Sequence, residues 1–537
     1  MSPRDTAGRL CLHLHAHLPF VRHPQHDRFL EEDWFYEAVG ECYLPLLEVL
    51  ERLAEDGVAY ELSLSLSPTL LAMLDDELLR RRTEVHLQRT LELAERELLR
   101  TRLDGRRNRL LRLYRDRYRR LLRRFCDHHR RDLIGAFGRL EAAGHLAIAT
   151  SAATHAYLPL LQHRPRLVAA QLQVALAEHQ RLLGRAPRGI WLPECGYHAG
   201  LDRSLAECGL EYCFLEAHGV LRARPRPALG VFAPIRCPAG PVAFGRDLSS
   251  AQLVWSARSG YPGDPEYREF YNDIGHELDL EVVRDHVQPD GRRKDTGIKL
   301  HRITGGSGPK GLYRPERAAA RAVAHAHHFA GRLRRQAAAA AAISGAGGAL
   351  LVAPFDAELF GHWWFEGPGF IEALLLELAR RPQQLRTVLP DRLAGAGGWP
   401  TAEPAASSWG RGGYSQVWLD SSNDWLYNHL DRAATDMLAL AQAHPNARGW
   451  RRRALDQMAR QLLLAQASDW PFILSTGTAV GYALRRVVGH LERVQRLALM
   501  VRSGRPDRNG LERLADRDRL FPELDYRIYR RTAAPHR

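Results

Sequence analysis

The stretch RLCLHLHAHL, residues 9–18, decides the fold class. Its alternation of apolar and polar side chains predicts a β-strand. A leucine-rich helical segment follows at residues 43–53, and a second alternating run, YELSLSL, occupies residues 60–66. The order strand, helix, strand is how α/β proteins begin, so we expect a parallel sheet covered by helices.

The same alternation of strand and helix patterns occurs again later in the chain and predicts a β/α barrel. Expected strands are GHLAIATS (144–151), GIWLPE (189–194), LEYCFLE (210–216) and ALLVAPFD (349–356), with helices at 165–183 and 315–342. Residues 76–140 interrupt the alternation with arginine-rich helices, and a Gly/Pro/Ala-rich linker at 394–408 precedes a mostly helical end. We therefore predict a barrel from residues 1–75 and 141–395, an inserted helical subdomain at 76–140, and a helical C-terminal domain at 396–537 that contributes to the active-site cleft.

The composition excludes disordered and fibrous classes, since 45% of the 537 residues are hydrophobic. The net charge is +14, and residues 101–131 hold 13 arginines against three aspartates, a surplus of ten that leaves +4 for the remainder. This surplus could indicate nucleic-acid binding or a coding bias toward arginine. The segment has leucines at helical spacing but no recognised nucleic-acid motif, so we interpret it as a solvated helical face and expect no nucleic-acid partner.

The seven cysteines are scattered without a CxxC pair, which argues against a disulfide framework or a thiolate zinc site. The N-terminus lacks the apolar core of a signal peptide, and no run of 18 apolar residues occurs. We expect a cytoplasmic protein with no membrane partner.

Two of the expected strands end in a carboxylate, GIWLPE at Glu194 and ALLVAPFD at Asp356. In a β/α barrel the C-terminal ends of the strands form the active-site face. Two carboxylates facing one cleft are the minimum for glycoside hydrolysis or transfer, because one attacks the anomeric carbon while the other gives and takes a proton. Either acid could instead cap a helix or pair with an arginine. Trp191 and Trp363, beside these acids, favour the catalytic interpretation because flat apolar rings suit sugar faces.

Histidines add to the candidate site. His13, His15 and His17 are spaced by two, which places them on one face of the first strand. We expect His13 and His15 to contact sugar hydroxyls, while a divalent-metal site at these two residues, as in a deacetylase- or amidohydrolase-like enzyme, remains an alternative. His155 lies just past another expected strand end, and His362 is placed to orient Asp356 or to sit at the barrel rim.

Several blocks of sequence resemble glycoside hydrolase family 57, and within it the 1,4-α-glucan branching enzymes. These blocks run in order through nearly the whole chain: HLHAHLPFVRHP (13–24), TSAATHAYLPLL (150–161), WLPECGY (191–197), FGRDLSSAQLVWSARSGYPGDPEYREFY (244–271), APFDAELFGHWWFEGP (353–368), SSWGRGGYSQVWLDSSNDWLYNHL (407–430) and ASDWPF (467–472). The resemblance implies an incomplete (β/α)7 barrel with a helical insertion and a helical C-terminal domain. It also implies that the chain cleaves an α-1,4 glucosidic bond and transfers the glucan to a 6-hydroxyl, forming an α-1,6 branch as in glycogen synthesis.

The resemblance assigns roles residue by residue. It implies Glu194 as nucleophile and Asp356 as general acid/base of a retaining mechanism, with the carboxyls roughly 5 to 5.5 Å apart. The further residues that it places around the glucan, together with the aromatic and histidine candidates above, are His13, His15, His155, Trp34, Trp191, Phe244, His362, Trp409, Trp418, Asp469 and Trp470. The chemistry requires no metal and no cofactor, and the expected partner is an α-1,4-glucan such as amylose or glycogen, bound by a monomer or weak homo-oligomer.

Two departures from the family pattern bear on the activity. Ala147 stands where relatives commonly have an acidic residue, and the interval from Cys213 to Gly260 contains no tyrosine, whereas the branching enzymes carry one on a mobile loop over the cleft. Phe244 is the nearest aromatic residue, and a phenyl ring excludes water but donates no hydrogen bond. The alternatives are therefore an amylase-like α-1,4-glucan hydrolase of the same family with weak branching, the metal-dependent enzyme, and a catalytically silent glycan-binding scaffold.

Overall fold

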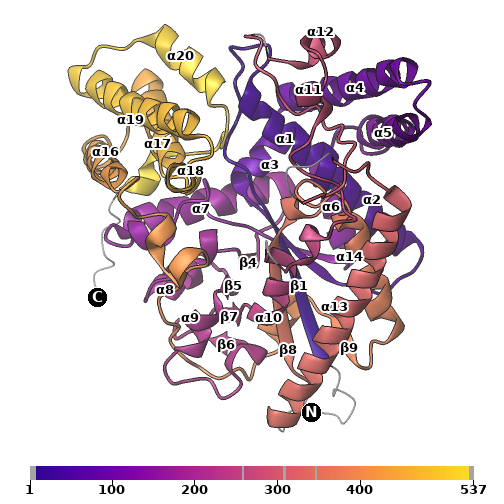
Figure 1. Cartoon of the computed structure of the whole chain (residues 1–537). Helices are drawn as coiled ribbons and strands as arrows, with labels where there is room; N and C mark the ends of the chain where they lie inside the picture. Colours follow the sequence, from indigo (N-terminus) through magenta and orange to yellow (C-terminus); the bar gives the residue numbers. More distant parts are fainter. Residues whose placement is uncertain (1–7, 257–258, 289, 306–309, 345–347, 531–537) are drawn as a thin grey trace.

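A computed structural model describes residues 8–256, 259–288, 290–305, 310–344 and 348–530. The fold is mixed α/β, with strands at the centre and helices around and above them (Figure 1). All seven cysteines are free thiols. Among the helices of the described residues, none combines the length and the apolar composition that a bilayer span requires.

The first sheet is parallel and is built on the N-terminal strand. Its order is β3 (Leu146–Ala149), β2 (Leu62–Leu66), β1 (Gly8–Ala16) and β8 (Leu350–Asp356), and β9 (Leu385–Thr387) also pairs with β1. The sequence-predicted strands at 9–18, 60–66, 144–151 and 349–356 are thus all present with shorter bounds. In the register of this sheet His15 lies opposite Ser65 on one side and Asp356 on the other.

The second sheet has the order β4 (Gly189–Ile190), β5 (Tyr212–Leu215), β7 (Val242–Gly245) and β6 (Ile235–Arg236), with only β6 antiparallel. Backbone contacts join the two sheets on both sides. Thr150, just after β3, forms a parallel bridge with Ile190, and the Asp247 N–H, just after β7, donates to the Val352 carbonyl of β8 at 2.8 Å. The parallel strands β8, β1, β2, β3, β4, β5 and β7 therefore follow one another around the centre.

The strand predicted at 189–194 is much shorter in the structure. Strand β4 ends at Ile190, and Pro193, which has no N–H to donate, begins a 3₁₀ turn over Pro193–Cys195 that carries Glu194. Asp356, in contrast, is the last residue of its strand, as predicted.

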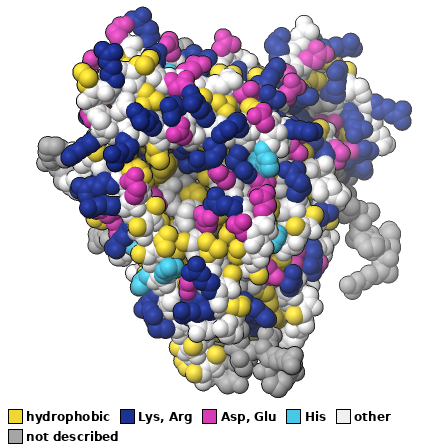
Figure 2. Space-filling model, turned by 90° about the vertical axis from the view of Figure 1, so that its right-hand side faces the viewer, with side chains coloured by type: hydrophobic (Ala, Val, Ile, Leu, Met, Phe, Trp, Pro, Cys, Tyr) yellow, Lys and Arg dark blue, Asp and Glu magenta, His cyan; other side chains and the backbone are white. Residues whose placement is uncertain are grey.

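Helices α4 (Glu77–Arg100), α5 (Gly105–Arg123) and α6 (Leu133–Ala142) form the arginine-rich segment, and α4 and α5 project at the upper right of Figure 1. Their buried side chains are the leucines and tyrosines, including Leu110, Tyr114 and Leu121. Many of the arginines pair with acids, as in Arg120 with Glu48 at 3.1 Å and Arg131 with Glu84 at 2.7 Å. On this face Figure 2 shows dark blue Lys and Arg side chains interspersed with magenta Asp and Glu.

The C-terminal helices gather at the upper left of Figure 1. They are α16 (Trp425–Ala443), α17 (Gly449–Ala465), α18 (Asp469–Thr476), α19 (Val480–Ser503) and α20 (Arg508–Arg517). The remaining helices around the strands are α1 (Asp33–Glu37), α2 (Leu44–Glu55), α3 (Pro68–Asp75), α7 (Pro165–Leu183), α8 (Leu201–Glu207), α9 (Ala217–Leu221), α10 (Leu248–Trp255), α11 (Ile274–Glu277), α12 (Leu280–Val283), α13 (Pro315–Ser344), α14 (Gly367–Arg380) and α15 (Pro390–Gly395). Helix α18 brings the C-terminal region to the strands, because the Ser468 N–H that precedes it donates to the His155 carbonyl at 3.1 Å.

Candidate active site

Glu194 lies in a strained turn at the end of β4. Its backbone has φ 63° and ψ 23°, and Cys195 follows with φ 51°. The left-handed region costs a non-glycine residue of order 1–3 kcal/mol, and such residues cluster at functional sites. His155, with φ 54°, is in the same conformation. The turn is held from outside because the Glu194 carbonyl accepts a 2.9 Å hydrogen bond from the Trp409 N–H.

The Glu194 carboxylate is nearly enclosed, with 13% of its side chain exposed, and two donors from different segments bind it. Trp409 Nε1 donates to Oε2 at 2.7 Å, and Ser468 Oγ donates to Oε1 at 3.0 Å. His155 Nδ1 lies 3.6 Å from Oε1. Burial raises the pKa of Glu194 to about 7, against the opposing effect of the Trp409 hydrogen bond.

Asp356 shares the electrostatic environment of Glu194. Burial raises the pKa of Asp356 well above its ordinary value, and the negative charges of Glu358 and Glu194 raise it further, while Arg246 acts in the opposite direction. Glu194 is held by two donors, and no hydrogen bond to the Asp356 side chain occurs among the described residues. The two hydrogen bonds stabilise the carboxylate form of Glu194, whereas burial and the neighbouring negative charges favour the protonated form of Asp356.

Two of the three strand histidines contact the residues around Glu194. His15 Nε2 lies 2.9 Å from His155 Nε2, and the His17 ring stacks on His155 with centroids 3.8 Å apart. His17 Nε2 also lies 3.2 Å from both carboxylate oxygens of Asp469. The site therefore uses His15 and His17, whereas sequence reasoning selected His13 and His15.

His13 lies one step deeper, wholly buried, with its ring nitrogens 2.8 Å from Ser63 Oγ and 3.1 Å from Ser65 Oγ. Burial lowers the pKa of His13 to about 3, so its ring is neutral. His15 also uses both ring nitrogens, in contacts with Ser65 and His155. In this arrangement neither His13 nor His15 offers a free nitrogen to a metal ion, which disfavours the metal-dependent alternative.

The tryptophans predicted for the site make ring contacts with neighbouring aromatic and histidine side chains. Trp191 is buried and stacks on His15 with centroids 5.0 Å apart, and it also packs edge to face against Trp409 at 5.0 Å. Trp418 is also buried and stacks on Tyr157 at 4.8 Å. Trp34 is half-buried and packs edge to face against Tyr482, at 5.6 Å.

Three predicted site residues lie elsewhere. Phe244 is 0% exposed and packs against Phe214 and Tyr212 in the interior, so it does not reach a cleft. Trp470 is likewise fully buried, with its indole N–H donating to the Leu464 carbonyl at 2.7 Å. His362 pairs with Glu41 at 2.8 Å rather than with Asp356. These side chains are held by neighbours inside the protein, a distinction that sequence blocks alone do not carry.

Three residues of the site, Ser468, Glu358 and Trp255, were not singled out in the sequence, and His17 was named there without a role of its own. Ser468 directly precedes Asp469 in the quoted block ASDWPF, and His17 directly follows the two histidines that were chosen. Glu358, two residues beyond Asp356, accepts a hydrogen bond from the His17 N–H at 3.2 Å. Trp255 ends α10, is 37% exposed and lies edge to face with Trp409 at 6.4 Å. Trp255, not Phe244, is thus the aromatic residue of the 213–260 interval that stands beside the Glu194 contacts.

Comparisons with known proteins match the whole chain to one group. The profile described as Glycosyl hydrolase family 57 matches residues 11–252, and the profile described as 1,4-alpha-glucan branching enzyme, C-terminal, matches residues 429–529. The chain is 31% identical to a 1,4-alpha-glucan branching enzyme of Thermococcus kodakarensis, with 96% of this chain and 77% of that protein aligned.

Solved structures agree with this match. The alpha-amylase AmyC from Thermotoga maritima superposes with a TM-score of 0.92 at 38% identity, covering 98% of this chain and all of that one. A branching enzyme from Pyrococcus horikoshii gives a TM-score of 0.87 at 31% identity, with 98% of each chain covered. These similarities extend over the strands, the arginine-rich helices α4 to α6 and the C-terminal helices.

Proposed function

The chain belongs to glycosyl hydrolase family 57, and from that premise we propose that it is a 1,4-α-glucan branching enzyme acting through Glu194 and Asp356. The observation that carries the proposal is the paired environment of the two acids. Trp409 and Ser468 donate hydrogen bonds to Glu194, while burial and the charges of Glu358 and Glu194 favour the protonated form of Asp356. One carboxylate ready to attack and one carboxylic acid ready to donate a proton are what a retaining glycosidase needs.

The arrangement of strands supports a layout of three parts. We propose that β8, β1, β2, β3, β4, β5 and β7 form the incomplete (β/α)7 barrel, with its gap between β7 and β8, which are joined by the single backbone contact from Asp247 to Val352. Residues 76–140 are then the inserted helical subdomain. Residues 396–537 are the C-terminal domain, which reaches the site through Ser468 and Asp469.

The first chemical step forms a covalent intermediate. The Glu194 carboxylate attacks the anomeric carbon of an α-1,4-linked glucose, and the bond from that carbon to the glycosidic oxygen breaks. Asp356 gives its proton to the departing oxygen, so the leaving glucan departs as an alcohol. The product is a glucosyl ester on Glu194, which no longer carries a negative charge.

The second step depends on the loss of that charge. Because the Glu194 charge raises the pKa of Asp356, esterification of Glu194 lowers the pKa of Asp356 and favours its carboxylate form. Asp356 then takes the proton from the 6-hydroxyl of an acceptor glucan, whose oxygen attacks the anomeric carbon and releases Glu194. The result is an α-1,6 branch with retained configuration, whereas water in place of the acceptor gives hydrolysis.

The residues around the acids position them. His15, His17 and His155 form a contiguous set of rings, and burial lowers the pKa of His15 and His155, so both remain neutral hydrogen-bonding groups. Trp409 has two functions in this arrangement: its indole N–H binds Glu194 and its ring, with that of Trp255, offers a flat surface beside the site. Rings of this kind suit the C–H faces of glucose.

A hydrolase of the same family is the second candidate. It is favoured by the absence of a tyrosine between Cys213 and Gly260, and the T. maritima structure with the TM-score of 0.92 carries the name alpha-amylase. The two candidates differ in the acceptor that the glycosyl-enzyme meets, so they share Glu194 and Asp356 and differ in products.

The test is a product analysis on amylose. New α-1,6 linkages, counted with a debranching assay, are compared with reducing ends released without debranching. Branching predicts an excess of new linkages over reducing ends, and an excess of reducing ends would assign the chain as a hydrolase. Glu194→Gln serves as the control for both products, because an amide cannot form the glycosyl ester.

A further inference from the structure

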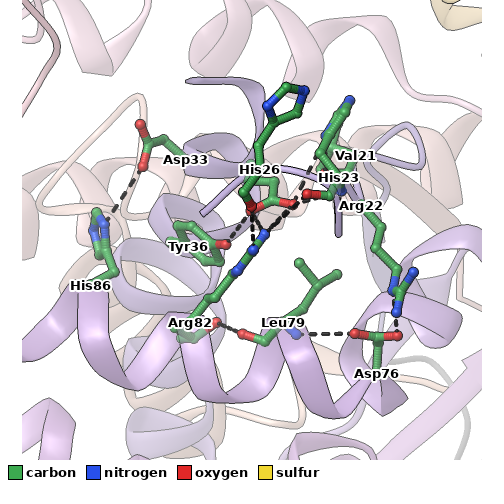
Figure 3. Close-up of polar contacts among 12 residues, drawn as sticks. Val21, Arg22, His23, His26, Asp33, Tyr36, Asp76, Leu79, Arg82 and His86 are labelled. Carbon is green, nitrogen blue, oxygen red and sulfur yellow. Dashed lines mark hydrogen bonds and ion pairs between the residues drawn. The ribbon is translucent and has the colours of Figure 1, made fainter. Parts of the chain in front are cut away.

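A cavity of about 210 Å³ lies outside the site described above, where three segments meet. Its walls come from residues 27–36, from α4 at residues 82–90, and from residues 285–288 and 294–296. Figure 3 shows Arg82 and His86 projecting from one face of α4 toward Tyr36 and Asp33. The cavity therefore joins the arginine-rich helices to the segment that carries Trp34.

Most charges at this cavity are already paired. Arg82 binds Glu32 at 2.7 Å, and Lys294 binds Asp33 at 2.7 Å. Asp295, also in the lining, forms an ion pair at 2.7 Å with Lys299, which is not part of the lining. Glu32, Asp33 and Asp295 are therefore committed to cations of the protein, and Asp285 faces Arg96 at 3.3 Å. Asp27, which is exposed, is the one carboxylate of the lining that no cation binds among the described residues, so a positively charged ligand would find no free carboxylate in the buried part of the cavity.

Two donors in the lining have no partner. Arg89 is half-buried on α4, and among the described residues none makes a hydrogen bond or ion pair with its guanidinium. Burial and the neighbouring charge of Arg28 lower the pKa of Arg89, and the charges of Glu92, Asp285 and Asp33 offset this effect only in part. His286 is 8% exposed and also lacks a hydrogen-bond partner within the described part of the chain. An anion would meet both needs, since guanidinium and imidazole N–H groups are strong anion donors.

We propose that this cavity binds a small organic anion, a phosphate monoester of monosaccharide size, with Arg89 as its principal donor. The volume of about 210 Å³ is below the roughly 300 Å³ at which pockets for drug-sized ligands begin, and it suits a phosphate attached to one sugar ring. The Phe29 ring in the lining supplies an apolar wall for the uncharged part. Arg28, whose Nη1 donates to the Asp285 carbonyl at 3.1 Å, adds positive charge from a second segment.

Binding would link the three segments, because Arg89, Arg28 and His286 come from different ones. A ligand that binds only the folded state raises the melting temperature by an amount that grows with the logarithm of its concentration above Kd. For a chain of 537 residues, a concentration of about 100 times Kd corresponds to a rise in Tm of roughly 2 °C.

The experiment is isothermal titration and thermal unfolding of the full chain with three probes: inorganic phosphate, glucose 1-phosphate and glucose. We expect glucose 1-phosphate to bind more tightly than inorganic phosphate, and glucose to show no binding that depends on Arg89. Binding of glucose that is lost in Arg89→Ala would overturn the proposal, because the cavity would then be a neutral-sugar subsite. Equal affinities for inorganic phosphate and glucose 1-phosphate would mean that the sugar ring makes no contact, and would overturn the proposal that the ligand is a sugar phosphate.

Variants of α4 supply the matched control. Arg89→Ala should weaken glucose 1-phosphate binding about 10-fold or more, as expected for a charge-assisted hydrogen bond, and Arg89→Lys should recover part of the loss. Arg81→Ala removes the same charge from the same helix at a side chain that is 65% exposed and faces Glu77. Equal weakening by Arg81→Ala and Arg89→Ala would mean general attraction to a basic surface and would refute a built site. The test does not require glucan turnover, so it is independent of the proposed function.

Discussion

Trp409→Phe tests how the protein keeps Glu194 ready to attack. The substitution preserves an aromatic ring against Trp191 and removes the indole N–H that donates to Glu194 Oε2 at 2.7 Å. The other side-chain donor, Ser468 Oγ at 3.0 Å, remains. Because the lost hydrogen bond stabilises the carboxylate and not the acid, its removal raises the pKa of Glu194 above its present value of about 7.

The size of the shift follows from the energy of that bond. A hydrogen bond to a charged group contributes about 1.5–3 kcal/mol, and one pKa unit corresponds to about 1.4 kcal/mol, so the shift is roughly one to two units. Since Glu194 must be ionised to attack, the acidic limb of the pH profile of kcat/KM moves from near pH 7 toward higher pH. At pH 6 the variant should lose roughly 10- to 100-fold relative to the native enzyme, in addition to any loss that is independent of pH.

The assay is initial-rate turnover of amylose from pH 5 to 9, counting new linkages and reducing ends together. Trp425→Phe is the matched control, since the Trp425 indole N–H donates to the Ser422 carbonyl at 3.2 Å in α16 and not to an acid. An acidic limb that stays in place in Trp409→Phe while the overall rate falls would refute the reasoning, because Trp409 would then act by shape alone.

Two further predictions concern stability. The pKa of Glu194, about 7 in the folded protein, lies above its ordinary 4.5, so folding above pH 7 carries a cost that protonation relieves as the pH falls toward 4.5. Glu194→Gln should therefore raise the free energy of unfolding by up to about 3 kcal/mol at pH 8, roughly 3 °C in Tm, and the gain should vanish near pH 4.5; a gain independent of pH would contradict this. Phe244→Ala should lower the free energy of unfolding by about 3–5 kcal/mol in denaturant titrations, with little change in KM for amylose, because Phe244 is fully buried. A raised KM at unchanged stability would instead place Phe244 in the cleft.

Much of the fold could be predicted from periodicity. The alternating strands and the leucine-spaced helices carry strong local patterns, so β1, β2, β8 and α7 lie where the sequence predicts them. The turn at Glu194 could not be predicted, because a left-handed glutamate is stabilised by contacts such as that of its carbonyl with the Trp409 N–H, 215 residues away. Local propensity contains no information about such a partner.

The candidate site, like the fold, was predicted only in part. Among the residues that the sequence blocks select, Trp409 donates a hydrogen bond to Glu194, His155 lies 3.6 Å from that carboxylate, and His15 contacts His155. The sequence blocks do not separate His17 from His13, because the strand period puts both on one face and only the packed structure shows which is buried against Ser63. How deeply a strand side chain is buried depends on the neighbouring strands and is not a property of the motif.

The central claim is that Glu194 forms the covalent intermediate and that Asp356, acting as a base on the acceptor, releases it. It is tested most directly by intact-mass and peptide mass spectrometry of Asp356→Ala after incubation with an α-maltosyl fluoride. Fluoride leaves without a proton, while release of the intermediate needs the missing base, so the account predicts an enzyme heavier by one maltosyl group, attached to the peptide that contains Glu194. An adduct on another residue, or an α-product formed by Asp356→Ala in the Glu194→Gln background, would contradict it.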